Sequence, residues 1–257
     1  MRSSLNDLDK YRKFLESIPL VKYRDELKDI KWVEQDLPKE LFPLESIFSH
    51  YWFARKFLDF EEWFRIFWKE INSKPANKQA LKKFKKYYFD KDGDGWFKKG
   101  FRARMYRTWI SVLTQLDFCY VFEHMCAQKR IGLALECNAE LDAKGIDAQV
   151  NEISFQVKKI SQRKEALRLE DKGSKITIPY AVFNIDDYQR KCQSDRVKDK
   201  AGYKKALDSF HKYFICLKNG FVVFNDHYLE LIVENIDDIK KLRRAIKNIS
   251  LELSGER

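Results

Sequence analysis

The chain has 257 residues, of which 44% are hydrophobic and 15% aromatic, so it can bury a substantial core and is not expected to be disordered. No stretch has the pattern of a signal peptide or approaches the roughly 18 apolar residues of a membrane span, which predicts a soluble cytoplasmic protein without a membrane partner. The length fits one large domain, and we expect residues 1–257 to form it, with a mostly helical part up to about residue 130.

The cysteines and histidines show no recognisable metal site. The four histidines lack metal-ligand spacing, so we expect them in the core or on the surface. The five cysteines are far apart and include no CxxC pair, which indicates reduced thiols and neither a disulfide framework nor a zinc site.

The net charge of +11 is unevenly distributed along the chain. Residues 69–107 hold ten lysines and three arginines against four acidic residues, a net charge of +9. A run of charge is commonly just a solvated helix face. Because so much positive charge lies in one stretch with interleaved aromatics, we favour a polyanionic partner, whose phosphates release counterions when lysine or arginine binds. The stretch suggests nucleic acid without indicating what is done to it.

The first half of the chain is predicted to be helical, with proline-containing loops between the helices. The clearest pattern is an apolar stripe from Met105 through Trp109 to Leu116 at three- and four-residue steps, as on one face of a helix. The expected helices are Leu5–Ile18, Leu44–Lys69 with a break, Lys78–Phe89 and Phe101–Gln128.

The second half changes to short segments rich in β-branched residues, which predict strands. The strongest single signal is Asn219-Gly220 between two apolar runs, typical of a β-hairpin. We expect an α/β fold in which a central mixed sheet is flanked by helices, behind a helical N-terminal half. The expected elements are strands at Ile131–Cys137, Ile146–Val150, Ile153–Ser161, Lys175–Phe183 and Tyr228–Val233, and helices over about Asp186–Phe214 and Asp237–Ile249.

One pair of these strands presents a polar face. Suppose that Ile146–Val150 and Ile153–Lys158 form an antiparallel hairpin that turns at the two residues between them. Asp147 then lies opposite Gln156, and because side chains alternate along a strand, Lys158 shares their face. An odd loop length or a bulge would break this arrangement, and Asn-Glu is not a favoured tight turn. The other face is expected to hold Ile146, Ala148, Val150, Phe155 and Val157.

That polar face offers what hydrolysis of a phosphodiester needs: a metal ion that neutralises charge and acidifies a water, and a cation beside the water. Asp147 and Asp142 would give magnesium anionic oxygens, and Lys158 would be the cation. The Gln156 amide or the Val157 carbonyl would complete the protein's share, because magnesium commonly takes only one or two carboxylates. The simpler alternative is that both aspartates only shape a turn and that the lysine is exposed on its strand.

The arrangement Asp147…Gln156-Val157-Lys158 resembles the signature of the PD-(D/E)xK nuclease superfamily, with glutamine in place of the acidic residue. Alone, this pattern matches unrelated chains by chance. More specific is a similarity to the TaqI family of restriction endonucleases in several separate blocks that follow the same order. These blocks are Val33–Pro38, His50–Trp52, Arg104–Trp109, Leu113–Leu116, Leu141–Asp147, Gln156–Lys159 and Asn219–Phe224.

The resemblance implies a type II restriction endonuclease with a restriction-endonuclease-like fold, a magnesium-dependent homodimer that cuts double-stranded DNA at the palindrome TCGA. It also implies a cognate DNA methyltransferase that protects host DNA. By the resemblance, Asp142 and Asp147 match the family's pair of catalytic aspartates, and Lys158 matches the motif lysine. A metal-activated water would attack the phosphate directly, and a two-fold dimer would match a palindromic target.

Residues that contact DNA are harder to single out. Arginine, lysine and amide side chains near the motif, or at the start of the long helix, are suited to base edges in the major groove. Most arginine and lysine contacts go to phosphates instead, so base readers and backbone contacts are not separated. The DNA-binding candidates are Arg102, Arg104, Lys159, Gln162 and Arg163.

Two other groups of acidic residues have competing interpretations. Glu136 and Glu140 are near enough in sequence to join a metal site, but the family match falls on Asp142. Asp90–Gly95 opens like a calcium-binding EF-hand loop, but lysine and phenylalanine occupy the ninth and twelfth positions, where ligands are needed. We expect a solvated acidic turn there.

Two rival functions stay open at this point. A PD-(D/E)xK repair or structure-selective nuclease would cut without a fixed sequence. A non-catalytic basic DNA-binding protein would carry the same positive charge, and its carboxylate and lysine residues would be incidental.

Overall fold

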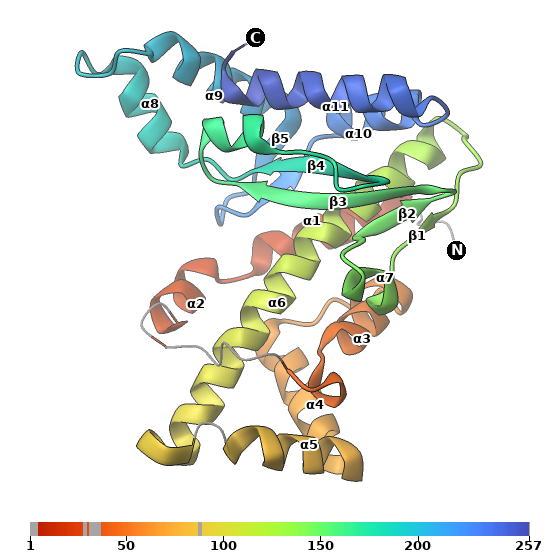
Figure 1. Cartoon of the computed structure of the whole chain (residues 1–257), viewed down its shortest axis with the longest axis vertical. Coiled ribbons are helices and arrows are strands. Elements are labelled where there is room, and N and C mark those ends of the chain that lie inside the picture. Colours follow the sequence, from red (N-terminus) through yellow and green to blue (C-terminus); the bar gives the residue numbers. More distant parts are fainter. Residues whose placement is uncertain (1–4, 28–29, 31–36, 87–88, 257) are drawn as a thin grey trace. The chain divides into compact units, whose positions relative to one another are not determined.

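The structure, a computed structural model, describes residues 5–27, 30, 37–86 and 89–256, and its elements are labelled in Figure 1. The chain divides into two compact units: Lys13–Leu116, and Met1–Arg12 together with Asp117–Arg257. The division falls inside two helices, α1 (Leu5–Ser17) and α6 (Phe89–Gln128). That residues 1–257 form one domain stays a prediction.

In the unit Lys13–Leu116, the described elements are all helical. The predicted break is confirmed, because α3 continues into a π-helix that ends before Arg55, where φ is 52°. Helix α4 begins after Asp59, whose side chain accepts a hydrogen bond from the Glu62 N–H at 2.8 Å. The elements are α2 (Leu20–Leu27), η1 (Lys39–Leu41), α3 (Leu44–Ile47), η2 (Phe48–Phe53), α4 (Phe60–Ser73) and α5 (Pro75–Lys86).

Large aromatic side chains form the core of this unit. Phe60 and Trp109 are fully buried, and their ring centroids lie 5.5 Å apart. Trp109 Nε1 donates to the Tyr51 hydroxyl at 2.8 Å, and that hydroxyl donates to the Leu58 carbonyl at 2.7 Å, so these buried polar atoms are hydrogen-bonded. Phe84 of α5 is buried as well, whereas Lys82, Lys83 and Lys86 of the same helix are exposed.

The other unit contains a four-stranded sheet in the order β1-β2-β3-β4. Strands β1, β2 and β3 pair antiparallel and β3 pairs with β4 in parallel, so the sheet is mixed, as predicted. The hairpin predicted around Asn219-Gly220 is also confirmed, as a separate antiparallel pair. The strands are β1 (Leu135–Glu136), β2 (Ala148–Val150), β3 (Ile153–Ile160), β4 (Lys175–Ala181), β5 (Phe214–Cys216) and β6 (Val222–Phe224).

One face of the four-stranded sheet is apolar. Phe155 of β3 is fully buried, and its ring centroid lies 5.6 Å from that of Phe118 in α6. Tyr180 of β4 shares this face and packs on Phe224 of β6, with ring centroids 5.4 Å apart. Because side chains alternate along a strand, the residues that alternate with Phe155 in β3 and with Tyr180 in β4 lie on the opposite face.

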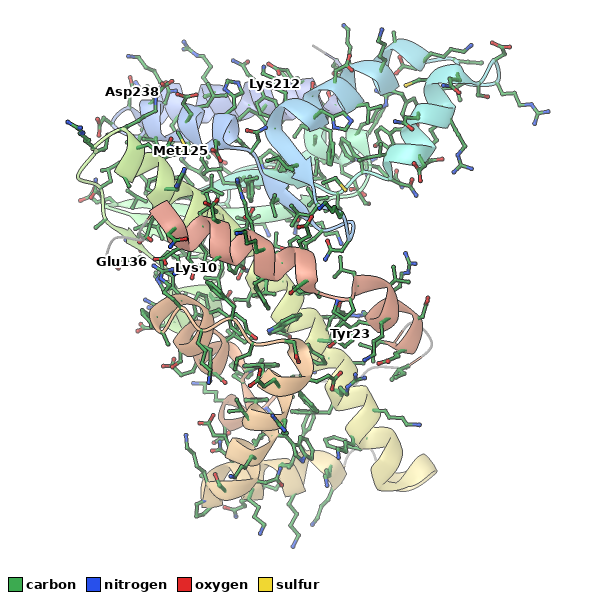
Figure 2. The ribbon with its side chains drawn as sticks, turned by 180° about the vertical axis from the view of Figure 1, so that it is seen from behind. Lys10, Tyr23, Met125, Glu136, Lys212 and Asp238 are labelled. Carbon is green, nitrogen blue, oxygen red and sulfur yellow. The ribbon has the colours of Figure 1, made fainter. Side chains whose placement is uncertain are left out.

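Helices complete this unit, and side chains link them to one another. Lys212 and Tyr213 of α9 both bond Glu252 of α11, at 2.9 and 2.7 Å (Figure 2 labels Lys212). Within the described residues, none of the helices combines the length and the apolarity that crossing a bilayer requires. The helices are α7 (Ala139–Ala143), η3 (Arg163–Arg168), α8 (Ile185–Gln193), α9 (Lys200–Tyr213), α10 (Asp226–Asn235) and α11 (Ile239–Ser254).

Several sequence predictions are wrong. The helix predicted over about Asp186–Phe214 is two helices, α8 and α9, separated by residues 194–199. Tyr228–Val233, predicted as a strand, lies in α10, where Asn225 accepts the His227 N–H at 3.2 Å and caps the helix. Its apolar residues recur at one- and four-residue steps and are buried together, which suits a helix as well as a strand. Asp90–Gly95, predicted as a turn, lies in α6.

Candidate active site

The segment between Asp142 and Asp147 is a tight reversal at the end of α7. The Gly145 N–H donates to the Asp142 carbonyl at 2.7 Å, and the Ile146 N–H donates to the Leu141 carbonyl at 2.9 Å. These bonds and the positive φ of 70° at Gly145 form a motif that commonly ends a helix at glycine. The chain therefore turns back on itself between the two aspartates.

Asp147 directly precedes β2 and is only 6% exposed. Its backbone N–H donates to the Phe155 carbonyl at 2.9 Å, and its Oδ2 accepts the Val157 N–H at 2.6 Å. A carboxylate held by a backbone N–H of the neighbouring strand has a defined orientation. The predicted register is confirmed, with the pairs Ala148–Phe155, Gln149–Ser154 and Val150–Ile153.

The two-residue turn that sets this register contains no glycine. Asn151 adopts a φ of 52° there. Asparagine enters the left-handed region more readily than most residues with a Cβ atom, because its short side chain can bond locally. Asn-Glu can therefore close the hairpin although it is not among the favoured pairs.

Burial and charge together shift the ionisation of Asp147. Desolvation raises the pKa of its carboxyl to about 7, and the negative charge of Asp142 acts in the same direction. The hydrogen bond from Val157 and the positive charge of Lys175 lower the pKa. Two carboxylates that repel each other at a buried position favour a divalent cation, and their hard oxygens suit magnesium.

Gln156 and Lys158 lie on the polar face of the sheet. Ser154 of β3 pairs with Lys175 of β4 in parallel register. Residues two positions apart share a face, so Gln156, Lys158 and Lys175 project from the same side. Lys158 is exposed, and its closeness to the Asp147 carboxylate stays a prediction.

The two other carboxylates considered as ligands have different surroundings. Glu140 is exposed and pairs with Lys144 at 2.6 Å, which lowers the pKa of Glu140, and Glu136 is exposed on β1. In the part of the chain that the structure describes, no three histidine, cysteine or acidic side chains gather closely enough to hold a metal. Magnesium needs no such cage, because it commonly takes one or two carboxylates and keeps several waters. Asp142 and Asp147 fit that requirement.

A family model described as TaqI restriction endonuclease matches residues 8–236 of the chain. The chain belongs to this family. It is 33% identical to the type II restriction enzyme TthHB8I of Thermus thermophilus over 262 residues, which cover 96% of this chain and 91% of that enzyme. It is 34% identical to the type II restriction enzyme TaqI of Thermus aquaticus over 239 residues, which cover 88% and 86%. No solved structure matches the chain.

Membership of the TaqI family confirms the resemblance stated from the sequence and makes the chain a type II restriction endonuclease. The match spans Asp142, Asp147 and Lys158. Of the blocks that carry the resemblance, residues 33–36 lie outside the described residues.

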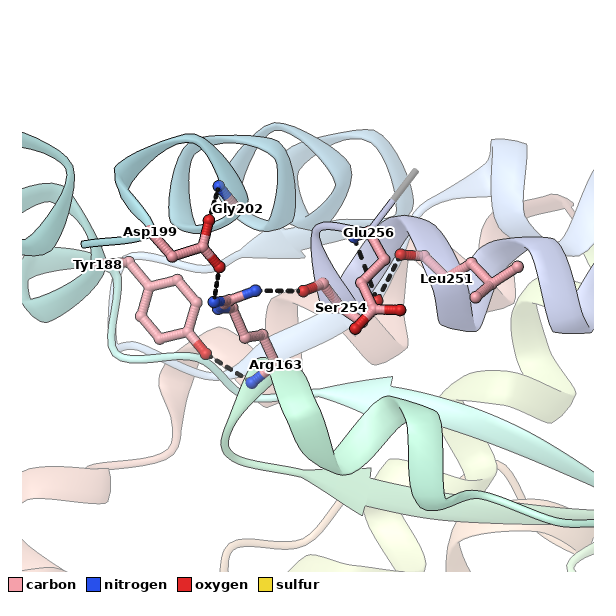
Figure 3. Close-up of polar contacts among 7 residues, drawn as sticks. All are labelled: Arg163, Tyr188, Asp199, Gly202, Leu251, Ser254 and Glu256. Carbon is pink, nitrogen blue, oxygen red and sulfur yellow. Dashed lines mark hydrogen bonds and ion pairs between the residues drawn. The ribbon is translucent and has the colours of Figure 1, made fainter. Parts of the chain in front are cut away.

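Arg163 is held within the fold of this restriction endonuclease. It is 6% exposed, and its guanidinium donates to the Ser254 carbonyl at 2.8 Å and pairs with Asp199 (Figure 3). Its backbone N–H donates to the Tyr188 hydroxyl at 2.8 Å, and its guanidinium lies 4.6 Å from the ring centroid of Tyr203. Because these contacts occupy a buried side chain, we leave Arg163 out of the DNA-contacting set.

The other candidates for DNA contact differ in their accessibility. Arg102 is bonded to Glu26 at 3.1 Å and to Glu61, so two carboxylates already neutralise it. Arg104 is half-buried, whereas Lys159 and Gln162 are exposed. Lys159 and Gln162 are therefore the members of the set that a DNA duplex can most easily reach.

Sequence reasoning did not include Lys175 in the site. It is half-buried at the start of β4, and its Nζ donates to the Lys144 carbonyl at 2.6 Å. No motif spacing relates it to Asp147. Only the parallel pairing of β3 with β4 places this lysine beside the turn.

Proposed function

We propose that this restriction endonuclease hydrolyses both strands of double-stranded DNA at a short palindrome, TCGA, as a magnesium-dependent homodimer with a restriction-endonuclease-like fold. The observation that carries the proposal is the tight turn at Gly145, which joins Asp142 at the end of α7 to Asp147 directly before β2. The substrate class is supported by both named relatives, which are type II restriction enzymes.

The ligand set is assigned as follows. Asp142 and Asp147 hold the cation through carboxylate oxygens, and the Gln156 amide or the Val157 carbonyl completes the protein's share. When bound, magnesium neutralises charge on the scissile phosphate and makes water more acidic. The Val157 N–H orients the Asp147 carboxylate in advance, so less ordering is needed when the cation binds.

Lys158 acts on the nucleophile. Its ammonium holds the attacking water by a hydrogen bond and stabilises the negative charge that develops at the phosphate. The water attacks phosphorus directly, and the bond to the leaving oxygen breaks without a covalent enzyme intermediate. This role needs an accessible cation on the polar face, and Lys158 is exposed there.

A homodimer accounts for cleavage of both strands. A two-fold symmetric pair of subunits presents one site to each strand of a palindrome. Gln162, just past the end of β3, contacts the DNA near the cleavage site, and the exposed lysines of α5 bind phosphates. Lys159 alternates with Lys158 and projects from the opposite face of β3, so it contacts the DNA away from the scissile phosphate. A cognate DNA methyltransferase protects the same palindrome in host DNA.

Digestion of plasmid DNA tests this function. With magnesium, we expect discrete fragments whose sequenced ends all fall at TCGA, and no cleavage in EDTA. A matched plasmid without TCGA should stay intact. A smear of fragments would favour a repair or structure-selective nuclease, and DNA binding without cleavage in any divalent cation would favour a non-catalytic DNA-binding protein.

A further inference from the structure

Lys175 makes two contacts with the turn that separates the candidate metal ligands. Its Nζ donates to the Lys144 carbonyl at 2.6 Å and to the Gly145 carbonyl at 3.3 Å. These carbonyls follow the last turn of α7, where the helix leaves carbonyl groups without an intrahelical partner. A lysine at that end also interacts favourably with the helix dipole.

The turn lies against the polar face of the sheet at this point. A methyl group at Gly145 would lie 3.3 Å from Lys175 Nζ and 3.8 Å from Gln156 Nε2. Lys175 is itself anchored, because its strand pairs in parallel with β3 and its N–H donates to the Lys172 carbonyl at 3.1 Å. A rigid strand thus holds the ammonium that contacts the turn.

We propose that Lys175 is a positioning residue of the cleavage site. Its ammonium ties the turn to β4 and so sets the separation of the Asp142 and Asp147 carboxylates that bind magnesium. This inference rests on the proposed function of the same two aspartates. Lys175 contacts backbone carbonyls of the turn and acts on the carboxylates through the chain that joins them.

Backbone hydrogen bonds close the turn itself, but the helix that precedes it is short. α7 has five residues, which is too short to be stable alone, and the carboxylates sit at its last turn and three residues beyond its C-terminal cap. Fixing a lysine side chain costs conformational entropy. Two hydrogen bonds from a charged donor offset that cost.

Three variants distinguish a positioning role of Lys175 from an effect of surface charge or of protein stability. Lys175→Met removes the ammonium but keeps the aliphatic stem, and Lys175→Arg keeps a cation that can donate to carbonyls. Lys172→Met is the matched control, because Lys172 is an exposed lysine on the same segment. Single-turnover cleavage is measured against magnesium concentration, and manganese binding to the protein without DNA is measured by calorimetry, both below the melting temperature of the least stable variant.

We expect Lys175→Met to need about 10-fold more magnesium for half-maximal cleavage and to bind manganese correspondingly more weakly, as for other residues that orient metal ligands. The cleavage rate at saturating magnesium should change much less. Lys175→Arg should recover most of the affinity, and Lys172→Met should match the parent enzyme. If Lys175→Met does not fold, Lys175→Gln, whose polar side chain is shorter and lacks the ammonium, takes its place with the same expectation.

Unchanged metal affinity in Lys175→Met, or in Lys175→Gln where it replaces Lys175→Met, would overturn the inference. So would an equal loss in Lys172→Met, which would assign the effect to surface charge. A different result would contradict the proposed function itself, namely a parent enzyme that shows no cleavage dependent on a divalent cation.

Discussion

Charged side chains are buried and hydrogen-bonded in one region of this protein and exposed in another. In the sheet-bearing unit, Asp147 and Arg163 are each 6% exposed and hydrogen-bonded to backbone groups. In the unit Lys13–Leu116, α5 has five lysines and no acidic residue. Four of these lysines are exposed and have no ion pair among the described residues, namely Lys78, Lys82, Lys83 and Lys86.

The difference matches the two tasks that we propose in handling DNA. A buried carboxylate with a fixed direction suits a metal ion, whose ligands must lie at defined positions. Exposed lysines on flexible stems suit the phosphate backbone, which is attracted to positive charge without a fixed geometry. Lysines four residues apart on one helix repel each other by about 0.2–0.5 kcal/mol per pair, and bound phosphates would relieve that repulsion.

The largest effect is expected at the fixed carboxylate. Asp147→Asn should lower the single-turnover cleavage rate by about 10³-fold, because the amide cannot give magnesium an anionic oxygen. DNA binding in calcium should be kept. The matched control is Asp186→Asn, at an exposed aspartate of α8, which should cleave normally. Cleavage by Asp147→Asn at the parent rate would remove Asp147 from the site.

Arg163 tests whether a buried cation in the same unit serves the fold. Arg163→Met should lower the free energy of unfolding by about 3 kcal/mol, since the Ser254 carbonyl and Asp199 lose a charged donor. Arg168→Met, on the exposed side of η3, should change it by less than about 0.5 kcal/mol. Urea denaturation measures both. A stable Arg163→Met protein with weakened DNA binding would reverse our assignment.

The pH dependence of stability follows from the raised pKa of Asp147. Its carboxyl has a pKa of about 7 in the folded protein and an ordinary value of 3.8, so between these values the folded state binds more protons. The metal-free protein should therefore lose stability as pH rises from about 4 to 7. Asp147→Asn should abolish this loss and be more stable at pH 8, by at most about 4 kcal/mol.

Thermal unfolding in EDTA at several pH values measures this difference. Added magnesium should stabilise the parent protein but not Asp147→Asn, because only the parent keeps the ligand. A parent protein whose stability rises between pH 4 and pH 7 relative to the variant would contradict the shift.

The smallest effect is expected from the exposed lysines of α5. Lys82→Gln, Lys83→Gln and Lys86→Gln together should weaken DNA binding about 10-fold and reduce the slope of log affinity against log salt by at most about 3. A matched triple on α11, Lys240→Gln, Arg244→Gln and Lys247→Gln, removes the same charge. Fluorescence anisotropy over a salt series measures both. Equal losses would mean that net charge matters and α5 has no particular role.

Local patterns were sufficient for the hairpin that carries the site. The register between β2 and β3 follows from strand alternation and a two-residue turn, both of which are set within about a dozen residues. The same rule correctly grouped Ala148 with Phe155 as buried residues. It failed at Tyr228–Val233, because a short apolar run fits a strand or a helix until a cap such as Asn225 is considered.

The sequence by itself determined the family, from blocks spread over most of the chain, and the hairpin register, which depends on residues close together along the chain. It also singled out the aspartates on either side of Gly145 as candidate ligands, because they too are close in sequence. Only the tertiary structure decided that Arg163 is buried and that Lys175 contacts the turn. Burial and the pairing of β3 with β4 join residues distant in sequence, and no local spacing encodes which side chains meet there.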